Sequence, residues 1–258
     1  MDNIEIAEEL YTSIQTRKVL TEKVIGVEIL STEDKKISCA VLIYKNSKVY
    51  IPCDEMGIEN VNKDIIDSMI GANIHFIVTR INKEKNEIIA SRKAANETIR
   101  KIELKNLNEG SIISGNVLSV SRNNLIVEVC GIDYRIPKEE VDWYRINNLK
   151  EYTKPGEQCS VLIKSISEAG IPEISLKEAK EDPYKNITYY FKPKGVYLAT
   201  VNGTAEYGVF VELKKGIVAL CSRTIKDEIF KKGDKVVIKV DDINKVQRKV
   251  YGRILRKV

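Results

Sequence analysis

The chain has 258 residues, of which 43% are hydrophobic and 31% charged, the balance of a soluble globular protein rather than a disordered one. No apolar run reaches the ~18 residues that a membrane-spanning helix needs. The start, MDNIEIAEEL, is acidic and lacks the basic flank and apolar core of a signal peptide. We therefore expect a cytoplasmic protein.

The formal net charge of +5 is unevenly distributed. Residues 193–258 hold 15 basic against 7 acidic side chains, a net charge of +8, whereas the preceding 192 residues hold 27 against 30, a net charge of −3. A concentrated positive field is typical of a surface that binds a polyanion. A lysine-rich, solvated surface without a ligand is the alternative.

Cysteine and histidine give little support for a metal or redox site. The five cysteines include no C-x-x-C pair, and their positions in apolar stretches indicate reduced core residues. His75 is the one histidine, too few for a metal site or a nucleophilic triad, and no Gly-rich phosphate-binding loop is present. We expect no metal and no cofactor.

One ten-residue spacing occurs three times and brackets a strand-like run each time. A repeat of about eighty residues predicts small β modules in tandem. The bracketing pairs are Gly71 and Ile81, Gly156 and Ile166, and Gly233 and Ile243.

Residues 1–19 are predicted to form a short amphipathic helix. A helix of this length is marginal alone, so it must dock, either on the first module or, as an arm, on a protein partner. Its apolar residues share one face: Ile4, Ala7, Leu10, Tyr11 and Ile14.

The segment 20–95 is predicted to hold five strands, with a short helix between the third and the fourth. The strands are KVIGVEIL, ISCAVLIY, KVYIP, NIHFIVTRI and EIIASRK, and the helix lies in NVNKDIIDSMIG. This is the element order of an OB-fold, a five-stranded, partly open Greek-key barrel.

Two further modules follow at 108–180 and 193–258. The strands of the second are SIISGNVLSV, NLIVEV, DYRIP, CSVLIKSI and PEISLK; those of the third are GVYLATVNGT, YGVFVEL, GIVALCS, KVVIKVDDI and KVYGRILRK. The two align without a gap through their first two strands, which matches Ile126 with Phe210 and Glu128 with Glu212. We predict an all-β chain of three tandem five-stranded OB-fold barrels, the first degenerate, joined by short, partly helical linkers.

The strand YGVFVEL carries the candidate ligand-binding surface. Alternation directs Val209 and Val211 inward and Phe210 outward, with Tyr207 just before the strand. Exposed aromatic side chains in a basic groove are how OB-type barrels stack the bases of single strands. The alternative is that a linker or a neighbouring module covers Phe210.

The third module also supplies candidate contacts to phosphates or bases. These candidates are Arg223, Arg248, Lys249 and Arg253. Each of them alone could equally be a surface charge without a ligand. In the second module Asn123 and Ile126 replace the aromatic pair, so we expect the first two modules to bind more weakly or to serve as scaffold.

The sequence VNGTAEYGVFVELKKGIVAL resembles the S-one RNA-binding domain, the OB-fold repeated in the largest protein of the bacterial small ribosomal subunit. So does SGNVLSVSRNNLIVEVCGIDYRIPKEEV, and the resemblance, which begins near residue 20, is strongest in the third module. In that family an aromatic pair, a histidine and a basic residue on one barrel face contact single-stranded RNA. The resemblance implies that Tyr207 and Phe210 are the pair and Arg253 the basic residue. It places the histidine position at Ala219, so that contact is absent.

We expect a non-enzymatic protein that binds mRNA-like single-stranded RNA, mainly through the third barrel, in translation. The alternative is an adaptor that docks on the ribosome or on an RNA enzyme through the N-terminal helix and first two barrels, with incidental RNA binding. A nuclease that holds Mg²⁺ on neighbouring carboxylates, such as Asp241 and Asp242, is less favoured because no further acidic residues complete a motif.

Overall fold

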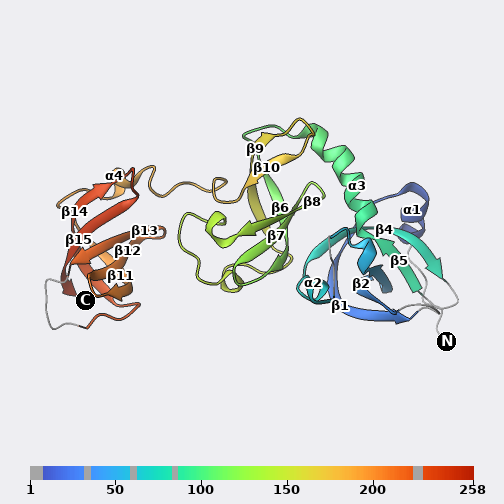
Figure 1. The fold of residues 1–258 in the computed structure, drawn as a ribbon, viewed down its shortest axis with the longest axis horizontal. Helices are drawn as coiled ribbons and strands as arrows, with labels where there is room; N and C mark the ends of the chain where they lie inside the picture. The colour runs from blue at the N-terminus through green and yellow to red at the C-terminus, as the bar shows by residue number, and fades with distance from the viewer. Residues whose placement is uncertain (1–7, 32–35, 59–62, 83–86, 223–228) are drawn as a thin grey trace. The chain divides into compact units, whose positions relative to one another are not determined.

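The computed structural model describes residues 8–31, 36–58, 63–82, 87–222 and 229–258. Its strands form three five-stranded sheets with the same connectivity, in which the first strand lies between the second and the fourth. The orders are β1-β2-β3-β5-β4, β10-β9-β6-β7-β8 and β11-β12-β13-β15-β14, and the first and third sheets close into barrels (Figure 1). The prediction of an all-β fold of tandem OB-type barrels is confirmed.

The elements of barrel 1 are α1 (Glu8–Thr16), β1 (Leu20–Ser31), β2 (Lys36–Tyr44), β3 (Ser47–Pro52), α2 (Lys63–Asp67), β4 (Asn73–Asn82) and β5 (Glu87–Ser91). Helix α3 (Arg92–Glu103) leads to β6 (Ile112–Val120), β7 (Asn124–Val129), β8 (Ile132–Pro137), β9 (Gln158–Ile166) and β10 (Pro172–Ser175). Helix α4 (Ile187–Tyr190) precedes β11 (Val196–Ala205), β12 (Gly208–Lys214), β13 (Ile217–Ser222), β14 (Lys235–Asn244) and β15 (Lys249–Lys257).

The middle sheet differs from the other two because it does not close. Barrels 1 and 3 close through parallel pairing of their third and fifth strands, whereas among the described residues β8 and β10 are not paired. Strand β10 is short and begins with Pro172, which has no N–H to donate. Instead the Tyr134 hydroxyl donates to the Pro172 carbonyl at 2.8 Å, so that a side chain joins the two edges.

The chain forms two compact units rather than three. The first contains barrels 1 and 2, and the second contains barrel 3 with residues 180–195 and the short segment Asp142–Arg145.

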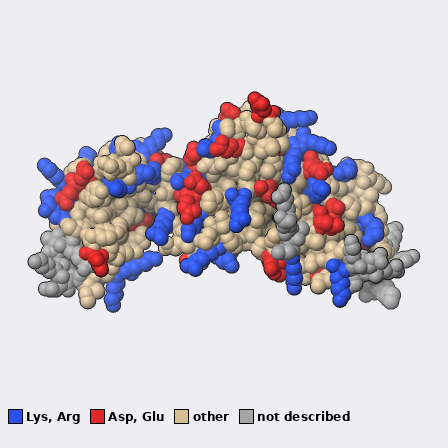
Figure 2. Space-filling view, viewed as in Figure 1, with Lys and Arg blue, Asp and Glu red and all other residues tan. Residues whose placement is uncertain are grey.

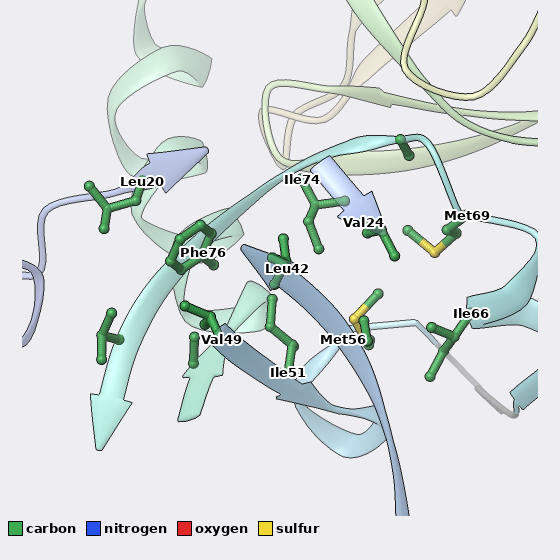
Figure 3. Close-up of a cluster of buried hydrophobic side chains, with 14 of the residues drawn as sticks. Leu20, Val24, Leu42, Val49, Ile51, Met56, Ile66, Met69, Ile74 and Phe76 are labelled. Atoms are coloured by element: carbon green, nitrogen blue, oxygen red, sulfur yellow. The ribbon is translucent and has the colours of Figure 1, made fainter. Parts of the chain in front are cut away.

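The core of barrel 1 is built by the inward-facing residues of its strands and is closed at one end by α2 (Figure 3). Phe76 and Leu42 are fully buried at its centre, and Ile66 and Met69 from the α2 segment cover one opening. The short helix predicted between the third and fourth strands therefore completes the hydrophobic core.

Helix α1 packs on barrel 1. Leu10 is fully buried in the barrel core, and the Ser13 hydroxyl accepts a hydrogen bond from the β4 backbone N–H of Val78 at 3.0 Å. The Tyr44 hydroxyl also donates to the Glu9 carboxylate. The described part of the helix therefore docks on the first module, the first of the two predicted alternatives. Ile4 and Ala7, which were also predicted to lie on its apolar face, are outside the described residues.

Replacing Leu10 by alanine should lower the free energy of unfolding by about 2–5 kcal/mol, because it opens a cavity where α1 meets the core. Ile14 on the same helix is partly exposed, so Ile14→Ala should cost clearly less. Urea unfolding followed by circular dichroism compares the two variants. Equal losses would show that α1 is not anchored through Leu10.

Candidate nucleic-acid interface

Barrel 3 presents a row of large side chains on its outer surface. Strand β12 alternates as predicted, with Val209 and Val211 fully buried and Phe210 half-buried on the outside. Tyr207 is 73% exposed, and its ring meets Phe210 edge to face, with centroids 6.0 Å apart and planes at 90°. A T-shaped pair of this kind holds both rings in place while leaving faces open for a ligand.

The neighbouring strands extend this row. Phe210 pairs with Leu220 on β13, and Leu220 pairs in parallel with Tyr251 on β15. Gly208 is required here for space, because a Cβ at that position would lie 2.8 Å from Cδ1 of Leu220. The result is a continuous outer surface across three strands, with Phe210 next to the exposed Tyr207.

Tyr251 was not predicted as a site residue. It is 37% exposed, and the alternation of KVYGRILRK places it on the outer face of β15 with Lys249 and Arg253. This alternation is a signal that the sequence contains. What the sequence lacks is the information that β15 joins β13 in parallel and so brings Tyr251 beside Leu220.

Two of the predicted basic residues lie on this outer face. Lys249 and Arg253 are exposed, and Arg253 forms a solvent-exposed ion pair with Asp241 at 3.2 Å. Basic side chains lie at several places on the visible surface of the second unit, on the left in Figure 2. Arg223 lies outside the described residues. Ligand contact by these residues stays a prediction.

Arg248 has protein partners on several sides. Its guanidinium lies 4.7 Å from the ring centroid of Trp143 and 4.6 Å from that of Tyr184, and it forms an ion pair with Asp182 at 2.8 Å. These groups all belong to the second unit. The arrangement gives Arg248 a packing role, and contact with a nucleic acid remains an untested prediction for it.

The position inferred for the family histidine requires a correction. Ala219 is fully buried and pairs with Val211, so it faces the barrel interior rather than the outer surface. The residue beside Phe210 on the outer surface is Leu220. The reason is the two-residue period of the strand, because a shift of one residue exchanges the two faces.

The matching surface of barrel 2 is covered by barrel 1. Ile126, which aligns with Phe210, packs against the core cluster of barrel 1, and Leu118 belongs to that cluster outright. Ser119, the pairing partner of Ile126, forms a 2.8 Å hydrogen bond with Ser68. Glu128, which aligns with Glu212, is almost completely buried. Barrel 2 therefore uses this surface to join barrel 1.

Arg92 holds the two barrels together. Its side chain is fully buried and pairs with Glu128 at 3.0 Å and with Asp133 at 2.6 Å, and it donates to the Met56 carbonyl at 2.9 Å. Burial acts to lower the pKa of Arg92, but the carboxylates of Asp133 and Glu128 outweigh it, and the pKa is raised. This role could not be predicted from the sequence, because nothing in EIIASRK distinguishes a buried arginine from an exposed one.

In barrels 1 and 2 the repeated glycine before the fourth strand lies at the contact between the two barrels. Gly71, Gly156 and Gly233 all have left-handed φ angles, which explains why glycine recurs there. A Cβ at Gly156 would lie 2.2 Å from the carbonyl oxygen of Gly71, so the two loops touch. Of the described residues, none comes within 4 Å of a Cβ built at Gly233.

In barrel 1 the position that matches Phe210 is occupied by Val41, and it is also buried. Val41 pairs with Gly26 as Phe210 pairs with Gly203, and Val41 is buried with Cys39 and Tyr50 in a small apolar cluster. Barrel 3 is therefore the one in which an aromatic side chain occupies this position.

Two other reactive side chains, His75 and Cys221, lie in packed surroundings. His75 lies where barrels 1 and 2 meet, with Nδ1 2.8 Å from the Thr21 hydroxyl and Nε2 3.5 Å from Glu128. Burial raises the pKa of Cys221 to about 12, which keeps it a thiol. Across the part of the chain that the structure describes, no three His, Cys, Asp or Glu side chains gather to hold a metal ion. No helix there is long and apolar enough to cross a membrane.

OB-type sheets in series, one with an exposed aromatic and basic face, define a protein built from nucleic-acid-binding modules. Residues 106–177 match the family described as the S1 RNA binding domain, the domain called S-one above. These residues therefore form an S1 RNA binding domain, and the chain is similar to ribosomal protein bS1 over most of its length. The matched segment is the second module, although we expected the strongest resemblance in the third.

Several curated proteins are similar to most of the chain. Small ribosomal subunit protein bS1 of Neisseria meningitidis is 28% identical over 70% of this chain, and that of Pseudomonas aeruginosa 25% over 70%. The 4-hydroxy-3-methylbut-2-enyl diphosphate reductase of Clostridium acetobutylicum is 24% identical over 83%. The chain spans 35% of the length of each of these relatives.

Proposed function

We propose that this protein binds single-stranded RNA through the outer face of barrel 3, without catalysis. The observation that carries the proposal is the exposed Tyr207–Phe210 pair, continuous with Tyr251 and flanked by Lys249 and Arg253. Stacked bases and neutralised phosphates are the two contributions by which OB-type barrels hold single strands.

We propose that barrels 1 and 2, which pack together in the first unit, serve as a structural module. Each has its matching surface occupied, in barrel 2 by barrel 1 and in barrel 1 by its own apolar cluster. Base stacking is therefore assigned to the second unit, where the positive charge of the chain is also concentrated.

The cellular role we propose is linked to translation and to mRNA-like strands. The support is the match to the S1 RNA binding domain and the similarity to protein bS1 of the small ribosomal subunit. The ribosome is accordingly a proposed partner. The buried Leu10 makes deletion of residues 1–18 a poor test of partner binding, because the deletion would also open the core of barrel 1.

The direct test is fluorescence anisotropy of a labelled single-stranded RNA of about 20 nucleotides, which covers the ~4–16 nucleotides of an OB-fold site. We expect saturable binding by the whole chain that weakens steeply as salt is added. No binding at low salt would refute the proposal and favour the adaptor alternative. Loss of intact RNA on adding Mg²⁺ would instead reveal a nuclease.

The salt dependence should identify the phosphate contacts. For single strands the logarithm of the affinity falls with the logarithm of salt concentration by about 0.7 per phosphate neutralised. Lys249→Met should therefore reduce the steepness of this slope by about 0.7 if Lys249 holds one phosphate. Lys101→Met, an exposed lysine on α3 in the first unit, is the control and should leave the slope unchanged. If the wild type, Lys249→Met and Lys101→Met all have the same slope, Lys249 does not contact a phosphate.

A further inference from the structure

A second exposed aromatic pair lies on α4 in the same unit. Tyr189 is 82% exposed and Tyr190 is 44% exposed, and their rings meet edge to face, with centroids 5.3 Å apart and planes at 85°. The short helix is anchored by Ile187 and Phe191, both buried in the core of the second unit. The two tyrosines are thus held at the surface by a well-packed support.

Lys214 fixes the place of this pair relative to barrel 3. Its ammonium group lies 3.9 Å from the ring centroid of Tyr190, a close cation–π contact. Lys214 is the last residue of β12, and Phe210 lies four residues earlier on the same strand. At about 3.3 Å per residue, roughly 13 Å of strand separates them.

The two aromatic pairs have the same construction. In each, one tyrosine is largely exposed, Tyr207 at 73% or Tyr189 at 82%, and a less exposed ring supports it edge on. Tyr207 and Phe210 lie at the beginning of β12, whereas Tyr189 and Tyr190 lie beside its end, where Tyr190 contacts Lys214. Glu212 lies between the two pairs, with a carboxylate oxygen that accepts a hydrogen bond from the Gly216 N–H at 3.4 Å.

The charge around α4 suits an anionic ligand. Residues 185–194 contain three lysines and no acidic side chain, and Lys214 adds a fourth cation. The next residue, Lys215, lies 4.7 Å from the ring centroid of Tyr144. Exposed rings among cations are the arrangement that stacks bases and attracts phosphates.

We propose that Tyr189, supported by Tyr190 and Lys214, is a second base-stacking site for the same RNA strand. This inference rests on the proposed function and extends it. The strand would follow β12 from Tyr207 and Phe210 to α4, and the bound length would exceed what the outer face of the barrel alone can hold.

The test compares single-stranded oligouridines of increasing length, from about 4 to about 20 nucleotides, a range that brackets OB-fold site sizes. Affinity for the wild-type chain should rise with length until both pairs are engaged. Tyr189→Ala should weaken binding of the longest RNA by at least about fivefold, the low end of the effect of losing one stacked base, and leave the shortest unaffected. Phe210→Ala should weaken binding at every length.

Tyr189→Trp is the matched control, because it keeps an aromatic face and should preserve the affinity for long RNA. Unchanged binding of the longest RNA by Tyr189→Ala would overturn the second site alone, and so would an equal loss at every length. If the wild-type chain binds no RNA of any length, the proposed function falls and the inference falls with it.

Discussion

Phe210→Ala should weaken binding of a 20-nucleotide single-stranded RNA by about 5- to 150-fold, which corresponds to the ~1–3 kcal/mol that stacking contributes per base. Phe210 is the central ring of the outer surface, since it supports Tyr207 and pairs through Leu220 with the strand that carries Tyr251. Its removal deletes one stacking face and leaves Tyr207 without its edge contact. Fluorescence anisotropy at constant salt measures the loss.

Leu198→Ala is a suitable control for this experiment. Leu198 is an exposed apolar side chain of the same barrel, but it lies on the part of β11 that pairs with β14, away from Phe210. Both variants should keep the circular dichroism spectrum of the wild type, and Leu198→Ala should also keep its RNA affinity. If Tyr207→Ala and Phe210→Ala both bind RNA as tightly as the wild type does, the proposal that bases stack on this surface is wrong.

Arg92→Met should lower the free energy of unfolding of the first unit by about 3–5 kcal/mol, the usual cost of breaking a buried ion pair. The change leaves the carboxylates of Glu128 and Asp133 close together without their cation, and Glu128 is almost completely buried. The matched control is Arg253→Met, which breaks an exposed pair with Asp241 and should cost at most about 1 kcal/mol. Urea unfolding followed by circular dichroism compares the two.

Removing the charge of the two partner carboxylates should identify the cause of this loss of stability. Combining Arg92→Met with Glu128→Gln and Asp133→Asn should restore much of the stability at neutral pH. A loss of stability that these two added substitutions do not rescue would mean that Arg92 acts through packing alone.

The strands could be predicted closely because local signals agree with the tertiary fold. KVYGRILRK became β15 with the predicted bounds, and NLIVEV became β7. In both segments buried residues recur at every second position, and glycine or asparagine marks the neighbouring turns. Phe210 could be placed outside for the same reason, because the buried Val209 and Val211 fix the face.

The joining of barrels 1 and 2 could not be predicted in this way. Glu128 and Glu212 occupy the same position in aligned strands, yet Glu128 is buried against Arg92 and Glu212 is only partly buried. The environment of such a residue depends on which modules pack together, and the strand pattern does not contain this information. The assignment of the family's histidine position to Ala219 was wrong for a related reason. Aligning the motifs by sequence alone does not consider the face of the strand on which each residue lies.

The covered surface of barrel 2 bears on the valency of the chain. Three repeats would suggest three sites and strong attachment through multivalency, in which one bound module raises the effective concentration of the next. Because the first two repeats have their matching surfaces buried, we expect one equivalent of RNA strand per chain and no gain from avidity among the three barrels. If the proposed function is right, counting repeats would overestimate the number of RNA-binding barrels threefold, and a titration at concentrations well above the dissociation constant should reach its end point at a ratio of one.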